Sequence, residues 1–144
     1  MKKHLVACVL LTFCCLPPSS IAGPAKKKTM IGVSLLTMTN PFFRELGDAM
    51  KDEAAKHQME VLLTAGEFDP ARQHHQVSDF ITRRVDAIVL SPCDSKSIGT
   101  AIAEANQAGI PVFTVDIAAL ASGIKVVSHV ATDNFGGEKW PPPR

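Results

Sequence analysis

The sequence indicates an α/β protein with a doubly wound parallel sheet. Short apolar segments alternate with longer amphipathic segments along most of the chain. The amphipathic segments begin at residues typical of helix N-termini. Strands that alternate with helices in this way form right-handed βαβ units, in which helices cover both faces of a parallel sheet.

Each expected element rests on a local pattern. Asn40 and Pro41 open the first helix, because Asn can cap free N–H groups and Pro suits the first helical position. Asp69 and Pro70 repeat this signal for a second helix that extends to Arg83. The apolar runs predict strands at residues 30–36, 60–65, 86–90, 111–115 and 125–130.

A third helix is expected at residues 95–107, capped by Asp94 and Ser95 and stopped by Gly109. Asp94 lies beside the expected cleft, so a ligand contact is a secondary possibility for its carboxylate.

The N-terminus has the pattern of an export signal. Two lysines precede an apolar run at residues 5–16 that is too short to span a bilayer comfortably. Small residues favour cleavage after Ala22, with Ala25 as the nearest alternative. We therefore expect residues 1–22 to be a signal peptide, residues 23–28 a linker, and the mature protein to be periplasmic.

Composition argues against several classes of function. The formal net charge of +1 gives no field that favours nucleic acid. The sequence contains no Gly-rich phosphate loop, nucleophile elbow or zinc pattern, so we expect no enzyme, cofactor or metal. Cys93 is the one cysteine beyond the expected signal peptide, and it is interpreted as a packing residue.

Candidate ligand residues follow the expected strands, because ligands of such sheets bind at the carboxyl ends of the strands. Asp116 ends the fourth strand, where a carboxylate can accept hydrogen bonds from two hydroxyls of a vicinal diol. Asn40 can donate to one hydroxyl and accept from another. Phe42 and Phe43 offer flat apolar faces to a sugar ring. Alternatively, Asn40 caps its helix and both rings pack in the core, or Phe42 packs while Phe43 faces the cleft.

Several motifs together resemble the type I periplasmic binding proteins, in particular the ribose-binding-like sugar group. The similarity extends over residues 30–137. The stretches that carry it are Asn-Pro-Phe-Phe at 40–43, Ser-Pro-Cys-Asp-Ser at 91–95, residues 105–112, Asp116, and Val-Ser-His-Val-Ala-Thr-Asp-Asn at 127–134.

The resemblance implies a fold of two lobes joined by a hinge that closes on a sugar. Residues 29–132 would be the first lobe, and Thr132 with Asp133 the first hinge crossing. The implied partners are a monosaccharide and the permease of an ABC importer, bound by a monomer. The implied ligand residues of the first lobe are Asn40, Phe42, Phe43 and Asp116.

Two features depart from the family pattern. Ile117 stands where many ribose-type relatives have Arg, which implies a different or less polar sugar. The family is about twice as long, as two domains require. Residues 133–144 are therefore interpreted as the hinge exit and a shortened start of the second lobe with an aberrant tail. The alternatives are the core of a sugar-responsive transcription regulator and a chemotaxis or sensor ligand-binding protein.

Overall fold

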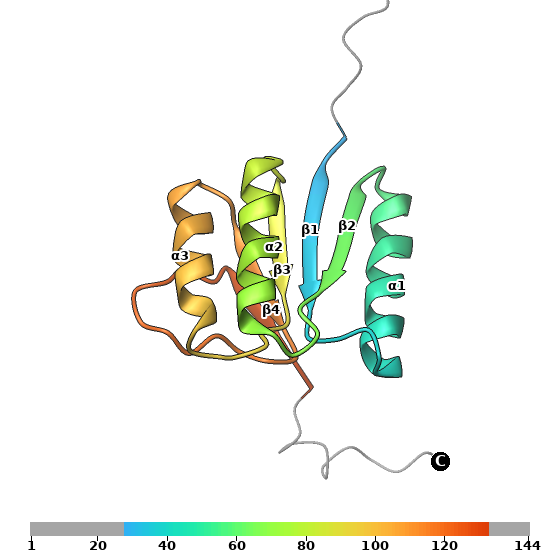
Figure 1. Cartoon of the computed structure of the whole chain (residues 1–144). Helices are drawn as coiled ribbons and strands as arrows, with labels where there is room; N and C mark the ends of the chain where they lie inside the picture. Colours follow the sequence, from blue (N-terminus) through green and yellow to red (C-terminus); the bar gives the residue numbers. More distant parts are fainter. Residues whose placement is uncertain (1–27, 133–144) are drawn as a thin grey trace, which may run out of the picture.

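The computed structural model describes residues 28–132, which form a five-stranded parallel sheet with helices on both faces (Figure 1). All neighbouring strands pair in parallel, in the order β2-β1-β3-β4-β5. The doubly wound parallel sheet is thus confirmed. In chain order the elements are β1 (Met30–Leu35), α1 (Pro41–Lys56), β2 (Glu60–Ala65), α2 (Pro70–Thr82), β3 (Ala87–Leu90), α3 (Ile98–Gln107), β4 (Val112–Val115) and β5 (Ser128–Val130).

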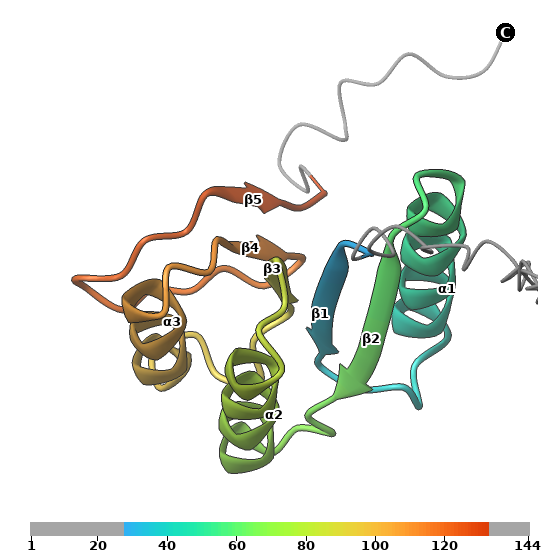
Figure 2. The same ribbon diagram turned by 90° about the horizontal axis from the view of Figure 1, so that it is seen from above.

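The strand order explains which face each helix covers. The chain moves to one side of β1 when it forms β2, and then crosses to the other side to form β3 and β4. Because such crossovers are right-handed, reversing the direction places the helix on the opposite face. Figure 2 shows α1 on one face and α2 with α3 on the other. The order reverses between β1 and β3, which is where sheets of this type bind ligands.

Each face of the sheet has its own apolar core. Gly32 in β1 allows the larger core to form, because a Cβ at this position would lie 2.6 Å from the ring of Phe80 on α2. The core beneath α2 and α3 includes Val77, Phe80, Ile88, Leu90, Ala101, Ile102 and Val112. The core beneath α1 includes Val33, Leu35, Phe43 and Val115.

The first two helices begin at the caps expected from the sequence. Asn40 Oδ1 accepts a hydrogen bond from the N–H of Phe42 at 3.0 Å. Asp69 Oδ1 accepts from the N–H groups of Ala71 at 2.9 Å and Arg72 at 3.1 Å. These bonds satisfy N–H groups that have no partner within the helix.

The third helix begins later than expected. Asp94 Oδ1 accepts from the N–H groups of Lys96 at 3.1 Å and Ser97 at 2.7 Å, which forms a turn before the helix. The regular α3 then starts at Ile98, so the predicted start at Ser95 is wrong by three residues. A short side chain that accepts hydrogen bonds from nearby N–H groups favours a turn over a helix, and the residues directly after Asp94 form such a turn.

The last strand is shorter than the expected range of 125–130. Its first predicted residue, Lys125, is bound by α3 instead. The N–H of Lys125 donates to Asn106 Oδ1 at 2.7 Å, and Asn106 Nδ2 donates to the Lys125 carbonyl at 3.1 Å. Regular pairing with β4 therefore covers only Ser128–Val130.

The predicted signal peptide and most of the linker lie outside the described residues, as does residue 133 onward. Within residues 28–132, no helix is long and apolar enough to cross a membrane.

Candidate functional site

A hollow of about 250 Å³ lies at the carboxyl end of β4, on the face of the sheet that α1 covers. It brings together Phe42 from the start of α1, Asp116 from the end of β4, and Thr132 after β5. Three residues singled out from the sequence thus meet at one place. Its complete lining is Phe42, Leu46, Val115, Asp116, Val130, Ala131 and Thr132.

Asp116 has an unusual backbone that fixes its carboxylate at this edge. Its φ is 61°, in the left-handed region that Asp tolerates better than most residues. The Asp116 N–H donates to the Val130 carbonyl at 2.8 Å, and the Ile117 N–H donates to the Val115 carbonyl at 2.7 Å. A tight three-residue turn therefore holds an exposed carboxylate beside β5.

The two phenylalanines have opposite orientations. Phe42 is 48% exposed and lines the hollow, whereas Phe43 is 3% exposed and packs in the core beneath α1. Their rings meet edge to face, with centroids 5.1 Å apart. The reading in which Phe42 packs and Phe43 faces the cleft is therefore wrong, because successive helical residues point about 100° apart and the inward position falls on Phe43.

The other candidates within residues 28–132 do not line the hollow. Asn40 is exposed, and its Oδ1 is used by the Phe42 N–H. Ile117 is half-buried in the turn after β4. Asp94 is exposed in the loop after β3. Hydrogen bonds lower the pKa of its carboxyl, and the bond from the backbone N–H of Ser97 is the main cause.

Four lining residues did not emerge from the sequence. Leu46 lies one helical turn after Phe42 and therefore on the same side of α1. Val115 and Val130 were read only as strand residues, and Ala131 only as part of the motif at the lobe exit. Strand pairing, which the sequence did not specify, is what brings Val130 beside Val115.

A buried amide on α2 joins the carboxyl ends of β1 and β3. Gln73 on α2 is fully buried, and its Nε2 donates to the Ser91 carbonyl at 2.9 Å and to Ser34 Oγ at 3.2 Å. Its Oε1 accepts from the Cys93 N–H at 2.7 Å. One side chain thus joins β1, β3 and α2. The sequence signal was a Gln on a helix face otherwise occupied by Val77 and other apolar residues.

Cys93 does not have the character of a nucleophile. Partial burial is the main cause that raises the pKa of its thiol, and the carboxylates of Asp69 and Glu67 raise it further. Its Sγ donates a weak bond to the Leu36 carbonyl at 3.9 Å. A raised thiol pKa disfavours the reactive thiolate. In the part of the chain that the structure describes, no group of three His, Cys, Asp or Glu residues could hold a metal ion.

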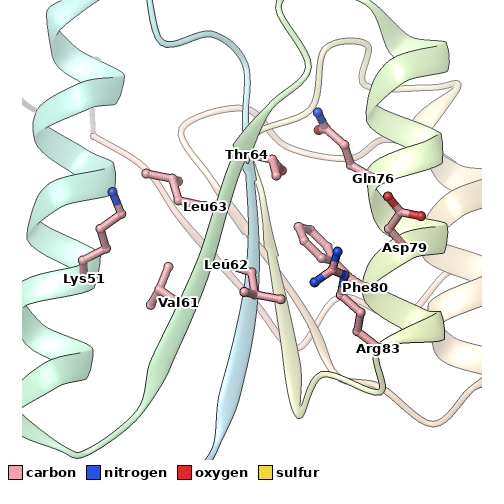
Figure 3. Close-up of a pocket in the computed structure, with 9 residues that line it drawn as sticks. All are labelled: Lys51, Val61, Leu62, Leu63, Thr64, Gln76, Asp79, Phe80 and Arg83. Carbon is pink, nitrogen blue, oxygen red and sulfur yellow. The ribbon is translucent and has the colours of Figure 1, made fainter.

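A second hollow, of about 390 Å³, lies along the edge strand β2 between α1 and α2 (Figure 3). Lys51 approaches from α1, Asp79 from α2, and Arg83 from the position directly after α2. Gln76 lines it too, but its amide is already used: Nε2 donates to the Ala65 carbonyl at 2.8 Å and Oε1 accepts from Ser34 Oγ at 2.7 Å. The hollow lies beside the sheet instead of at the strand ends, so it is the weaker candidate.

The hollow beside β4 is chemically suited to a neutral polyhydroxy ligand. It combines an aromatic ring, a carboxylate that accepts hydrogen bonds, and apolar walls. Sites for small molecules commonly have this mixture of apolar lining and few polar groups.

The profile of a known family, the periplasmic binding protein domain, matches residues 31–137. The chain belongs to this family. Apart from Met30, the first residue of β1, the matched range includes every strand and helix described above, and the resemblance stated from the sequence motifs is confirmed.

Curated relatives are sugar import proteins. The ribose import binding protein RbsB of Bacillus subtilis (strain 168) is 41% identical over 134 residues, which is 90% of this chain and 43% of that protein. RbsB of Escherichia coli (strain K12) is 35% identical over 141 residues, 96% of this chain and 45% of that protein. The chain therefore spans less than half the length of these relatives.

Solved structures agree with the sequence comparison. A periplasmic solute-binding protein of an ABC transporter from Actinobacillus succinogenes 130z, with bound D-allose, matches with a TM-score of 0.71 and 26% identity. That match covers 76% of this chain and 41% of the other. A myo-inositol-binding protein from Caulobacter matches with a TM-score of 0.70 and 25% identity, over 79% and 38% of the two chains.

Proposed function

We propose that this chain is a sugar-binding lobe of the periplasmic component of an ABC importer, and that its ligand is a monosaccharide or a related polyol. The observation that supports this most directly is the hollow that Phe42 and Asp116 share at the carboxyl end of β4. The relatives named above carry ribose, allose or myo-inositol in their names or structures, and all of these are neutral polyols.

The mechanism we propose is capture without a chemical reaction. The Asp116 carboxylate accepts hydrogen bonds from ligand hydroxyls, and charged acceptors make the stronger bonds of this kind. The Phe42 ring covers an apolar face of the ligand. Asn40 contributes its amide nitrogen as a donor, since its oxygen is engaged in capping the helix. The buried ring of Phe43 packs edge to face against the ring of Phe42 and helps to fix its position.

The remaining parts of the proposal concern the chain around this lobe. Residues 1–22 direct export, with cleavage near Ala22, and the mature monomer acts in the periplasm. Thr132 and Asp133 form a hinge crossing toward a second lobe. Closure around the sugar is then the signal to the permease, because a hinge motion changes the surface presented by the two lobes.

A sensor role is the second candidate, and one comparison favours it. The fructose-binding periplasmic domain of the hybrid two-component system BT1754 matches with a TM-score of 0.68 and 25% identity, over 74% of this chain and 35% of the other. The sugar site would be the same, and the partner would be a membrane sensor in place of a permease.

NMR titration of the isotope-labelled chain with D-ribose, D-allose and myo-inositol tests the proposal. We expect at least one of them to shift the amide signals of Phe42, Asp116 and Thr132 in a saturable way, while glycine, the control, leaves them unchanged. The absence of saturable shifts at these residues with all three ligands would contradict the proposed function.

A further inference from the structure

The carboxylate of Glu67 binds the loop that precedes α1. Glu67 lies between β2 and α2, and its Oε2 accepts a hydrogen bond from Thr37 Oγ1 at 2.6 Å. Its Oε1 accepts from the Met38 N–H at 2.9 Å. Both oxygens thus hold adjacent residues of one loop through charge-assisted bonds, which are the strong ones.

The contact continues toward the sugar site through Thr37. This side chain is 1% exposed, and its Oγ1 accepts from the Thr39 N–H at 3.1 Å. The hydroxyls of Thr37 and Thr39 also lie 2.9 Å apart. Thr39 immediately precedes Asn40, whose Oδ1 caps α1 at Phe42. Hydrogen bonds therefore join Glu67 to Thr37 and Thr39, and a peptide bond joins Thr39 to Asn40, which caps the helix that carries Phe42.

The backbone around Glu67 is fixed on both sides. The Gly66 N–H donates to the Leu35 carbonyl at 2.9 Å, and the Phe68 N–H donates to the Leu36 carbonyl at 3.2 Å. Between these bonds, Glu67 and Phe68 have φ angles of 53° and 62°. Two successive non-glycine residues in the left-handed region persist only where their surroundings hold them firmly.

The electrostatics favour the ionised form of Glu67. The hydrogen bond from Thr37 is the main cause that lowers the pKa of the Glu67 carboxyl, followed by the bond from the Met38 N–H, and Arg72 on α2 adds attraction. Burial opposes this in part. Asp69 and the Cys93 thiol are also titratable groups close to Glu67, whereas residues 37–39 include none. Glu67 does not line the hollow.

We propose that Glu67 is a positioning residue of the sugar site: it holds the loop of residues 37–40 in the conformation that presents Asn40 and Phe42 to the ligand. The proposal rests on the proposed sugar-binding function. It attributes part of the affinity for the sugar to Glu67, a residue that does not line the hollow.

A double-mutant cycle tests this inference in the full chain. Glu67→Gln keeps the size of the side chain but replaces one acceptor oxygen with a donor, so it cannot accept both bonds. We expect it to weaken sugar binding three- to tenfold and to speed amide exchange at Met38 at least tenfold. Thr37→Val should have a similar effect, and the double variant should be no weaker than either single variant within twofold. Thr37→Ser keeps the hydroxyl that Thr37→Val lacks, so it should bind the sugar with the affinity of the wild type.

Glu60→Gln is the matched control, because Glu60 is exposed at the opposite end of β2. It should change neither measurement. Wild-type affinity and unchanged Met38 exchange in Glu67→Gln, or additive effects in the double variant, would overturn the proposal.

Two measurements keep this test separate from the proposed function. If the wild-type chain binds none of the sugars, that function fails, and the exchange rates at Met38 and Thr39 alone decide whether Glu67 holds the loop. A pH titration of the wild-type Met38 amide needs no variant. Because the pKa of Glu67 is lowered in the folded chain, its contribution is complete above the ordinary Glu pKa of about 4.3 and is lost as the pH falls through the lowered value. An amide signal that does not change over this range would contradict the contact.

Discussion

Asp116 combines two roles that a substitution can separate, namely a charged acceptor and a residue in the left-handed region. Asp116→Asn keeps a side chain that tolerates this backbone but removes the charge. We expect it to weaken sugar binding about tenfold, since hydrogen bonds to charged groups contribute roughly 1.5–3 kcal/mol. Its midpoint of urea unfolding should stay unchanged. Calorimetric or NMR titration measures the first quantity and urea denaturation the second.

Asp116→Ala is the companion variant. It removes the same carboxylate and leaves an alanine in the left-handed region, which lacks the short polar side chain that makes this backbone tolerable for Asp or Asn and costs about 1–2 kcal/mol. It should therefore lose stability as well as affinity. Equal sugar affinity in the wild type and both variants would remove Asp116 from the binding site.

The comparison of Phe42 with Phe43 shows what the sequence could and could not decide. The Asn-Pro signal placed both rings in the first turn of a helix, and the structure confirms this. The choice of the exposed ring depends on the angle at which α1 sits on β1 and β2. That angle comes from contacts between segments distant in the sequence, and no local pattern records it.

Asp69 shows how one side chain determines the start of an element. Asp69→Ala removes the acceptor for the N–H groups of Ala71 and Arg72. We expect it to lower the free energy of unfolding by about 1 kcal/mol, the usual loss for an N-cap, while Asp69→Asn should cost only a few tenths. Urea denaturation followed by circular dichroism measures both. Equal losses in the two variants would show that the negative charge, and not the cap, stabilises α2.

The ends of helices and strands could be predicted where neighbouring residues determine them. The prediction failed where contacts between distant segments determine them. Both Asn-Pro and Asp-Pro mark helix starts to the residue, because cap and proline act within one turn. Gly109, with φ of 75°, likewise follows the end of α3. The predicted start of the last strand, at Lys125, was wrong because Asn106, nineteen residues away in sequence, binds Lys125. Apolar alternation gives no sign of such a competitor.

The sheet as a unit explains where ligands can bind and which surface is left bare. Strand alternation predicted a parallel sheet, but not the order β2-β1-β3-β4-β5 that creates the reversal between β1 and β3. Among residues 28–132, α1 lies mainly over β1 and β2 (Figure 2), and a largely apolar hollow of about 320 Å³ extends from Met50 across Val89 to Phe113 and Val130. The polar residues that line this hollow are Glu53 and Thr114.

The hollow beside β4 can contact a ligand from one side only, and this geometry predicts a low affinity. The proposed ligand contacts come from the exposed Phe42 ring, the Asp116 carboxylate, the Asn40 amide and the segment after β5, and the hollow is open to solvent. Tight binding of a polyol requires that most of its hydroxyls be paired and removed from water, and partly solvated contacts contribute little. We therefore expect this chain to bind its sugar with a Kd in the millimolar range, about −4 kcal/mol.

The ribose import binding protein of Bacillus subtilis, of which the chain spans 43%, is the natural reference for this measurement. Titrated side by side with the same sugar, it should bind at least 100-fold more tightly than the chain. The difference would then measure what the other half of such a protein adds by enclosing the ligand. A micromolar Kd for the chain itself would contradict this reasoning, because it would mean that the residues around Phe42 and Asp116 are sufficient to desolvate the sugar.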